Sequence, residues 1–237
     1  MTAQQLCRWQ VFPDAGALRD AAVAIIDQAA RQAIAARGEF HIVLSGGNTP
    51  RAVHERLASL KTDWSAWHIY FGDERCLPPH DAERNSCMAH DVWLGCVAIP
   101  PMQMHLIPAE LGAMRGAQEY AKVLHEVGKF DLVMLGLGED GHTASLFPGQ
   151  DWGIADDSPD VLAVHDAPKP PPERVSLSAA RLSRAHRVMF LVAGAAKREA
   201  VARWQAGEKI PASAITPEGG VEVLVEMTAM AEGNLQT

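Results

Sequence analysis

Four short apolar runs, each followed at once by a polar or glycine-containing turn, constrain the fold of this chain more than any other feature. The runs span residues 40–44, 67–71, 130–135 and 188–192, and the turns begin at Ser45, Gly72, Gly136 and Ala193. Short, nearly continuous hydrophobic runs are typical of strands covered on both faces, as in a parallel sheet. The four runs therefore predict four buried parallel strands.

Segments with helical periodicity lie between these runs. Asp14 is suited to cap a long helix that ends near Gly38. Thr49 and Pro50 fit the N-cap and first position of a helix that extends to about Leu60. Further helices are expected near 85–94, 113–127 and 195–206. This alternation predicts an α/β fold with an open, mostly parallel, Rossmann-like sheet and helices on both faces.

The chain length is compatible with one domain, and we expect residues 1–237 to form a single unit. One candidate linker is present, the proline-rich stretch 166–177. Fewer than 70 residues follow it, and they include another strand and helix. We therefore interpret this stretch as a loop that leads into an extra strand of the same domain.

The composition restricts the class of partner and the compartment. The formal net charge is −8, and lysine and arginine form no basic tract, which argues against nucleic-acid and anionic-membrane partners. No apolar run reaches the ~18 residues of a membrane span, and no signal-peptide pattern is present. We expect a soluble cytoplasmic protein, a monomer or a small homo-oligomer, whose ligand is a small molecule.

The four cysteines suggest free thiols in a reducing compartment, because they form no C-x-x-C pair. Cys76 with His80, and Cys87 with His90, loosely imitate the spacing of zinc ligands. Structural zinc usually takes tightly spaced ligand pairs around a compact loop, whereas prolines and polar residues intervene here. We therefore interpret these four as surface loop residues and expect neither a metal nor another cofactor.

The glycines at 136, 138 and 141 have the G-x-G-x-x-G spacing of dinucleotide-binding loops. That motif requires a long helix after its third glycine, to receive a pyrophosphate at the helix N-terminus. Here Pro148 and Gly149 follow within about two turns, and Glu139, Asp140 and His142 crowd the loop. We therefore expect a tight loop that presents His142 and Asp140 to the crevice, with Asp140 among the substrate contacts and no nicotinamide or flavin cofactor.

The loops should converge, because ligands of open parallel sheets bind at the carboxyl ends of the strands. His142 lies in one such loop, where an imidazole can accept a proton from water near neutral pH. Asp73 and Arg75 follow the second apolar run, and could handle a proton and offset negative charge. A solvated charge run is the alternative interpretation of these two residues.

An anion site is predicted at the loop after the first run. Gly46 and Gly47 expose backbone N–H groups, Asn48 and Thr49 add polar side chains, and a helix begins there. A simple strand-to-helix turn explains the same loop, which lacks the Lys-Ser/Thr pair of a P-loop. Two more cations that could hold an anion in this acidic protein are Arg174 and Lys197.

Five segments taken together resemble the 6-phosphogluconolactonase family, in order and over roughly residues 8–230. They are 44–50 (LSGGNTP), 71–94 (FGDERCLPPHDAERNSCMAHDVWL), 130–149 (FDLVMLGLGEDGHTASLFPG), 174–201 (RVSLSAARLSRAHRVMFLVAGAAKREAV) and 210–215 (IPASAI). The resemblance implies a fold shared with glucosamine-6-phosphate deaminases. It also implies hydrolysis of 6-phospho-D-glucono-1,5-lactone to 6-phospho-D-gluconate, in the oxidative branch of the pentose phosphate pathway.

The resemblance assigns roles to individual residues. His142 matches the general base, and Asp73 and Arg75 match an Asp-x-Arg pair. The residues that match sugar-phosphate contacts are Gly46, Gly47, Arg174 and Lys197. Two positions depart from the family pattern, since Asn48 and Arg84 stand where serine is common.

Two rival functions share these loops. The deaminase branch resembles this chain but has a glutamate five positions after the histidine, where this sequence has Phe147. A non-catalytic sugar-phosphate-binding regulator would keep Arg174 and Lys197 but would not need His142. A covalent mechanism through Ser45 or Ser145 is disfavoured, because the sequence contains no G-x-S-x-G elbow.

Overall fold

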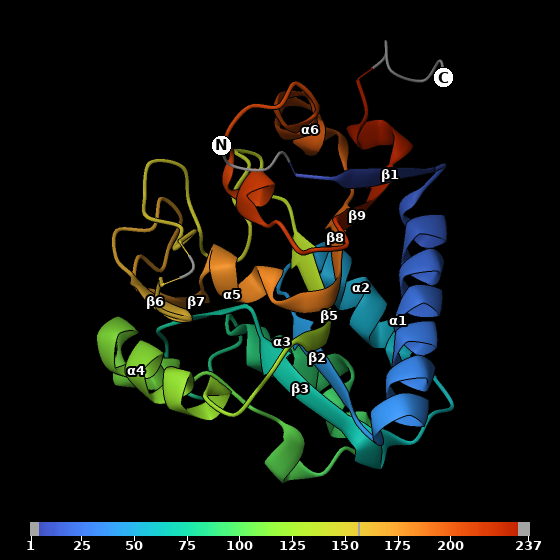
Figure 1. The fold of residues 1–237 in the computed structure, drawn as a ribbon, viewed down its shortest axis with the longest axis vertical. Helices are drawn as coiled ribbons and strands as arrows, with labels where there is room; N and C mark the ends of the chain where they lie inside the picture. The colour runs from blue at the N-terminus through green and yellow to red at the C-terminus, as the bar shows by residue number, and fades with distance from the viewer. Residues whose placement is uncertain (1–4, 156, 232–237) are drawn as a thin grey trace.

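The main sheet contains six parallel strands. The computed structural model describes residues 5–155 and 157–231 (Figure 1). In spatial order the strands are β1 (Cys7–Phe12), β9 (Val221–Glu226), β8 (Ala185–Val192), β5 (Phe130–Gly136), β2 (Phe40–Leu44) and β3 (Trp67–Phe71). Every neighbouring pair is parallel. The four predicted strands and their parallel arrangement are confirmed, whereas β1 and β9 were not predicted.

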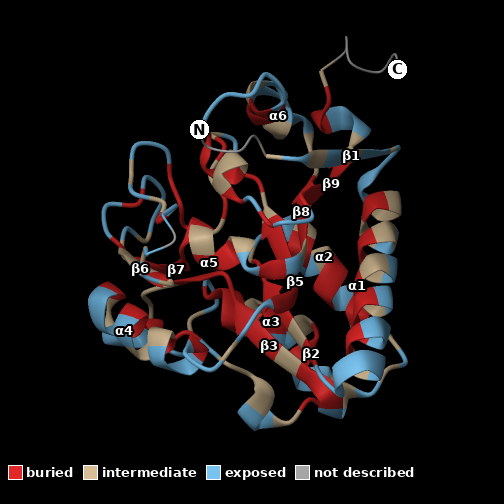
Figure 2. Ribbon diagram, viewed as in Figure 1, coloured by how far each residue is buried: buried red, intermediate tan, exposed pale blue. Residues whose placement is uncertain are grey.

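Helices follow most of these strands. They are α1 (Ala15–Arg37), α2 (Asn48–Leu57), α3 (Asn85–Val92), α4 (Ala113–Leu124), α5 (Ala179–Ser183) and α6 (Arg198–Gln205). Helix α1 packs against β2, β5 and β9, and α5 packs against β8 (Figure 1). All residues of 130–135 in β5 are buried, so both faces of the sheet are covered (Figure 2). The predicted α/β fold class is therefore confirmed.

The caps predicted for α1 are present. The Asp14 side chain accepts a hydrogen bond from the Ala17 backbone N–H at 2.8 Å. Gly38 ends the helix with a φ of 83°, a conformation that costs glycine little because it has no Cβ. Local sequence chemistry alone is enough to place both ends of this helix.

The predicted start of α2 is wrong. The helix begins at Asn48, with Gly47 as its N-cap, and no side chain caps it. Gly47 has a φ of 98°, so the chain enters the helix through a conformation that favours glycine. Thr49 therefore lies within the first helical turn. The helices expected near 85–94, 113–127 and 195–206 are present, with α6 preceded by a 3₁₀ turn at Ala195–Lys197.

A second, antiparallel sheet lies beside the first. It contains β4 (Asp73–Arg75), β7 (Arg174–Leu177) and β6 (Val161–Val164), in that order. The stretch 166–177 does lead into a strand, as predicted, but β7 pairs with β4 and β6 instead of joining the main sheet. This pairing places β4, which follows β3 after one residue, next to a segment about 100 residues later in the chain.

The two sheets share one hydrophobic core. A single cluster of buried side chains includes Leu132 and Phe190 of the main sheet with Val161, Val175 and Leu177 of the small one. Figure 2 shows these central strands as the buried part of the molecule. A shared core supports our proposal that the chain is one domain.

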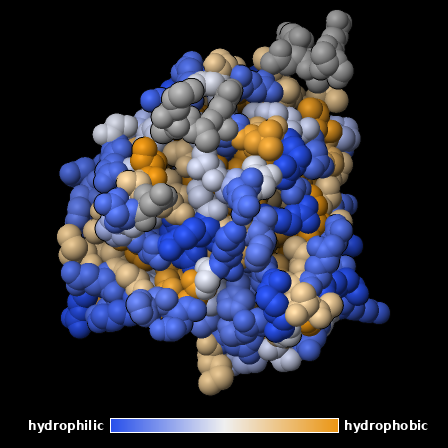
Figure 3. Space-filling model, viewed as in Figure 1, coloured by the Kyte–Doolittle hydropathy of each residue, from blue (hydrophilic) through white to orange (hydrophobic). Residues whose placement is uncertain are grey.

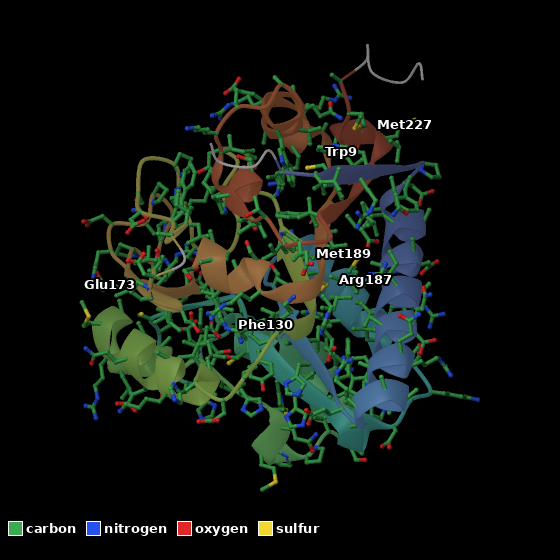
Figure 4. All side chains as sticks on the ribbon, in the orientation of Figure 1. Trp9, Phe130, Glu173, Arg187, Met189 and Met227 are labelled. Carbon is green, nitrogen blue, oxygen red and sulfur yellow. The ribbon has the colours of Figure 1, made fainter. Side chains whose placement is uncertain are left out.

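Two aromatic contacts fix the edges of this core. Trp9 of β1 packs edge-on against Trp204 of α6, with ring centres 5.2 Å apart (Figure 4). Phe130, at the start of β5, lies 3.8 Å from the guanidinium carbon of the buried Arg181, measured to the ring centre (Figure 4). These contacts join the terminal strand and the short helix α5 to the central sheet.

The molecular face seen in Figure 3 is mostly hydrophilic, with scattered hydrophobic patches. Scattered apolar groups are normal on protein surfaces. Among the described residues, 5–155 and 157–231, no helix is both long enough and apolar enough to cross a lipid bilayer.

Candidate active site

The predicted convergence of loops at the carboxyl ends of the strands is present. A pocket of about 330 Å³ lies there. Its lining comes from the loops after β2, β5 and β8, from β4, and from the segment that precedes β7. The lining residues are Ser45, Gly46, Gly47, Asp73, Arg75, Asn85, Gly136, Leu137, Gly138, His142, Thr143, Ala144, Phe147, Lys169, Pro170, Arg174 and Lys197.

His142 is held in one orientation by Asp140. The His142 Nδ1 lies 2.5 Å from Asp140 Oδ1, and the His142 backbone N–H donates to the same oxygen at 3.1 Å. An ionised carboxylate accepts hydrogen bonds only, so Nδ1 carries the proton and the Nε2 lone pair is available. A neutral imidazole with a free Nε2 is the form required of a general base.

The ionised state of Asp140 is favoured by this contact. Burial raises the pKa of Asp140, but the hydrogen bonds from the His142 side chain and backbone and the charge of His142 outweigh it and lower the pKa. Asp140 itself does not line the pocket. Its carboxylate contacts His142 instead, although we expected Asp140 among the substrate contacts.

The glycines of the 136–141 loop have steric roles. A Cβ on Gly138 would lie 2.0 Å from His142 Nδ1, so only glycine leaves room for the ring. Gly141 has a φ of 89°, and a Cβ there would lie 2.9 Å from Ile210. The next regular element after Gly141 is β6, and no long helix follows. The loop therefore lacks the long helix that a dinucleotide fingerprint requires, and of the two side chains that it was expected to present, only His142 lines the pocket.

Asp73 is buried at the pocket wall with both oxygens engaged. Its Oδ2 accepts from the Ser145 hydroxyl at 2.5 Å, and its Oδ1 accepts from Asn85 Nδ2 at 3.2 Å. Asn85 Nδ2 also donates to the Asp73 carbonyl at 2.9 Å. Asn85 approaches Gly46 so closely that a Cβ at Gly46 would lie 1.9 Å from Asn85 Oδ1. These contacts join β4, α3 and the loop after β2 into one rigid wall.

Glu74 points away from the pocket, because side chains alternate along a strand. Its carboxylate accepts from the backbone N–H groups of Asn85 at 2.7 Å and Ser86 at 2.9 Å, and from the Ser86 hydroxyl at 2.6 Å. Arg84 pairs with it, with Nε 3.5 Å from Oε2. Glu74 thus caps α3 from a neighbouring strand, and it positions Asn85 without touching the pocket.

Four cationic side chains line the pocket and make it suitable for an anion: Arg75, Lys169, Arg174 and Lys197. Arg174 donates from Nε and Nη2 to the carbonyls of Lys169, Pro170 and Pro171, at 2.9 to 3.2 Å, and this leaves Nη1 for a ligand. Burial lowers the pKa of Lys197. The carboxylate of Glu139 raises this pKa, and the positive charge of Lys169 lowers it. The opposite charge of a bound dianion would offset the cost of this burial and the repulsion between the two lysines.

Not every predicted residue lies at the pocket. Asn48 and Thr49 are absent from its lining and lie in the first turn of α2. At this end of the helix, the backbone N–H groups of the first turn are the donors that remain for a ligand. Several lining residues were not predicted as site residues, and Asn85 and Lys169 are the two of these that matter most for the polar contacts. Lys169 lies in the proline-rich loop, and Arg174 holds that loop at the pocket, so no local signal marked it.

The cysteines and histidines considered as zinc ligands do not assemble into a site. All four cysteines are free. In the part of the chain that the structure describes, Cys76, His80, Cys87 and His90 are not members of any three-residue group with metal-binding spacing. Cys87 instead donates to the Pro79 carbonyl at 3.2 Å.

The chain matches a family model over most of its length. The model describes glucosamine-6-phosphate isomerases and 6-phosphogluconolactonases, and it matches residues 13–224. A Mycobacterium leprae protein named 6-phosphogluconolactonase is 34% identical over 226 residues, which cover 90% of each chain. A Nostoc protein of the same name is 33% identical, over 94% of this chain and 97% of its own.

Solved structures show the same fold. A 6-phosphogluconolactonase from Thermotoga maritima superposes with a TM-score of 0.85 and 25% identity, over 93% of this chain and 100% of its own. A monomeric glucosamine-6-phosphate deaminase superposes with a TM-score of 0.77 over 94% of this chain and 98% of its own. At 19% identity the deaminase shows a shared fold only.

Proposed function

The chain belongs to the glucosamine-6-phosphate isomerase/6-phosphogluconolactonase family, and we propose that it hydrolyses 6-phospho-D-glucono-1,5-lactone with His142 as general base. The observation that carries this proposal is the Asp140–His142 pair at the edge of a cationic pocket. The pair supplies a base with a free Nε2, and the pocket supplies a site for a phosphate. The enzyme is thus a sugar-lactone hydrolase of the oxidative pentose phosphate pathway.

The phosphate binds among the cations of the pocket. Arg174 and Lys197 approach from β7 and from the turn after β8, and the glycines at 46 and 47 expose backbone N–H groups beside the N-terminus of α2. Charge-assisted hydrogen bonds from a guanidinium and an ammonium are the strong contacts that a phosphate prefers. Lys169 adds a third cation from the loop that Arg174 holds. Binding at this end directs the lactone ring toward His142.

Hydrolysis then requires a base and an acid in succession. His142 Nε2 removes a proton from a water molecule while the water oxygen forms a bond to C1, and the carbonyl electrons move onto oxygen. The tetrahedral oxyanion collapses, the bond from C1 to the ring oxygen breaks, and the His142 imidazolium returns its proton to that oxygen. A lactone is an activated acyl group, so these reaction steps need no covalent nucleophile. Arg75, which lines the same pocket, is a candidate to offset the developing charge.

The two rival functions are less well supported. Phe147 is buried, and its ring centre lies 4.8 Å from that of His142, so an apolar ring occupies the place of the deaminase glutamate. A purely binding protein would have no use for the hydrogen bond that fixes the His142 tautomer. Both observations favour hydrolysis of a lactone over isomerisation or simple binding.

The compartment and partners belong to the same proposal. Four free cysteines suit a reducing compartment, and we place the protein in the cytoplasm. The net charge of −8 disfavours nucleic acid as a partner. Its expected assembly is a monomer or a small homo-oligomer.

The proposal is tested by following lactone loss directly. Glucose 6-phosphate and its dehydrogenase generate the lactone in situ, and the protein should accelerate its disappearance well above spontaneous hydrolysis. His142→Ala should reduce kcat about 10²–10⁴-fold, the usual contribution of a general base. His125→Ala is the control, since His125 is exposed on the surface. Wild-type activity in the His142 variant would refute the role of this residue.

A further inference from the structure

A cluster of three side chains lies at the opposite end of the main sheet from the pocket. Glu39, His41 and His68 form the one group, among the described residues, of three histidine, cysteine or acidic side chains with ligand atoms all within 4.8 Å of one another. His41 and His68 are paired neighbours near the starts of β2 and β3. These starts lie near the lower end of α1 in Figure 1, whereas the pocket lies at the carboxyl ends of the strands. The cluster is therefore separate from the proposed catalytic site.

The distances within the cluster match those between the ligands of one metal ion. Glu39 Oε1 lies 3.1 Å from His41 Nε2, and Glu39 Oε2 lies 3.8 Å from His68 Nε2. Ligand atoms at ~2.0–2.1 Å from a tetrahedral Zn²⁺ are separated by about 3.4 Å. The two measured separations lie on either side of that value. The Nε2 atoms of both rings thus lie beside the same carboxylate. The rings stack with their planes 7° apart and their centres 4.6 Å apart, so metal binding requires them to rotate until both Nε2 lone pairs point to one ion.

The other nitrogen of each ring already has a partner. His41 Nδ1 lies 3.1 Å from the Tyr70 hydroxyl, and His68 Nδ1 lies 3.3 Å from His105 Nε2. Histidines that bind metals almost always donate the second ring N–H to such an acceptor, which fixes the tautomer and the ring plane. Tyr70 and His105 in turn stack on each other with ring centres 4.4 Å apart. The structure therefore supplies the outer contacts of a metal site as well as its ligands.

The backbone beneath the cluster is fixed, and the cluster itself is open to solvent. Asp131 accepts from the His41 backbone N–H at 2.8 Å, and the His105 backbone N–H donates to the Ile69 carbonyl at 2.8 Å. The side chains of His41 and His68 are 18% and 24% exposed, and that of Glu39 is 51% exposed. An ion from solution can thus reach the three ligand atoms without local unfolding.

We propose that Glu39, His41 and His68 bind one divalent transition-metal ion of the Zn²⁺ type, through the carboxylate and the two Nε2 atoms. Two imidazoles and one carboxylate suit Zn²⁺ and its neighbours in the first transition row, and they do not suit Mg²⁺ or Ca²⁺, which prefer oxygen ligands. Water fills the remaining coordination position. The inference does not depend on the proposed lactonase activity.

Calorimetric titration of the metal-free, full-length protein with Zn²⁺ tests the proposal. One Zn²⁺ per chain should bind at this cluster in the wild type, and Glu39→Gln and His68→Gln should each weaken that binding at least about 10-fold. Tyr70→Phe, which removes only the hydroxyl beside His41, should weaken it about 10- to 100-fold. His125→Gln, with an exposed histidine elsewhere, should bind as the wild type does. Lactone hydrolysis should be unchanged in all four variants.

A second readout separates this site from the pocket histidine. Co²⁺ bound by two imidazoles and a carboxylate gives visible absorption bands, which should persist in His142→Ala and disappear in His68→Gln. Far-UV circular dichroism verifies that each variant is folded, and Glu39→Gln is the safest substitution because that side chain is half-exposed. The proposal would be overturned if the wild type failed to bind Zn²⁺, or if Glu39→Gln and His68→Gln bound Zn²⁺ with the affinity of the wild type. The cluster would then be a set of hydrogen-bonded surface groups.

Discussion

His142 depends on two close neighbours for its position. Asp140 fixes the ring through Nδ1, and Gly138 leaves the space that the ring occupies. Both residues lie within four positions of His142, so the loop contains its own positioning groups. The loop and its histidine could be predicted from the sequence, but the contact between Asp140 and His142 could not, because a sequence does not reveal the direction of a side chain.

Replacement of Asp140 by asparagine should reduce activity without abolishing folding. The amide is uncharged and can present either oxygen or N–H₂ to Nδ1, so the reactive tautomer of His142 is no longer enforced. We expect kcat to fall on the order of 10²–10⁴-fold, with a smaller change in KM. Steady-state kinetics measures this. An unchanged kcat would show that the Asp140–His142 contact has no role in catalysis.

The same substitution should alter the pH dependence of stability. Because the folded-state pKa of Asp140 is lowered, its ionised form stabilises the fold above the ordinary aspartate pKa of 3.8. That contribution is lost as the pH falls through the lower folded value. The difference in unfolding free energy between the wild type and Asp140→Asn should therefore be constant near neutral pH and shrink in acid. Urea unfolding between ~pH 3 and ~pH 7 measures it.

Gly138→Ala should displace His142. The added Cβ would lie 2.0 Å from Nδ1 and 2.2 Å from Cε1, so the ring must move. A displacement of ~1 Å at a reacting group costs about 100-fold in rate. Gly128→Ala is the matched control, because a Cβ at Gly128 meets nothing within 4 Å. If both variants retained wild-type kcat, the steric role of Gly138 would be refuted.

At the scale of secondary-structure elements, the N-terminus of helix α3 is capped by a residue of a neighbouring strand. No residue next to Asn85 caps this helix through its side chain, and Glu74 of β4 binds its first N–H groups instead. Glu74 and its partner Arg84 are almost fully buried. The capped helix end carries Asn85, which binds Asp73 at the pocket. The stability of this junction thus determines the shape of the site.

Glu74→Ala should destabilise the protein strongly. It leaves the backbone N–H groups of Arg75, Asn85 and Ser86 without their acceptor, and each buried donor that loses its partner costs about 1–3 kcal/mol in the free energy of unfolding. Arg84 keeps its ion pair with Glu110 at 2.9 Å. Glu74→Gln keeps an acceptor oxygen and should cost less. Exposed Glu83→Ala should stay within about 0.5 kcal/mol of the wild type. Urea unfolding compares the three variants, and equal stability of all three would contradict the capping role.

Strands could be predicted where the apolar sequence was continuous and not where polar residues interrupted it. The runs that became β2, β3, β5 and β8 are almost wholly apolar and nearly all buried. Strand β1 alternates between half-buried and exposed residues at the sheet edge, and β9 contains Glu222. Arg187 pairs with Glu222 through two hydrogen bonds of 2.9 Å, which makes a charge tolerable there. That partner belongs to β8 and cannot be identified from the β9 sequence.

At the scale of the whole molecule, the two sheets should unfold together. Val175 and Leu177 of the small sheet belong to the same buried cluster as the strands of the main sheet. Leu177→Ala should lower the unfolding free energy of the entire protein by about 2–5 kcal/mol. Tryptophan fluorescence and far-UV circular dichroism should report one coincident urea transition, shifted in the variant. Two separate transitions would contradict the single domain that we propose.

A surface substitution provides the control for this comparison. Met102 is 84% exposed, so Met102→Ala removes an apolar side chain without leaving a cavity. Its effect on the free energy of unfolding should stay within about 0.5 kcal/mol. The contrast with Leu177→Ala separates loss of the shared core from loss of apolar surface in general.

Elements with local causes could be predicted from the order of residues alone. Continuous apolar runs predicted the central strands, Asp14 and Gly38 bounded α1, and the order of the loops placed His142 at the carboxyl edge of a parallel sheet. These features depend on residues a few positions apart, so propensity and periodicity suffice.

Contacts between distant residues depend on how the whole chain folds. The pairing of β4 with β7 brings Asp73 beside Ser176, and Ser145 reaches Asp73 from 72 positions away. The same long-range folding places Lys169 at the pocket and sets His41 beside His68 at the other end of the sheet. Strand register and loop closure fix such contacts, and they depend on the packing of the whole chain because no short stretch of sequence contains both partners.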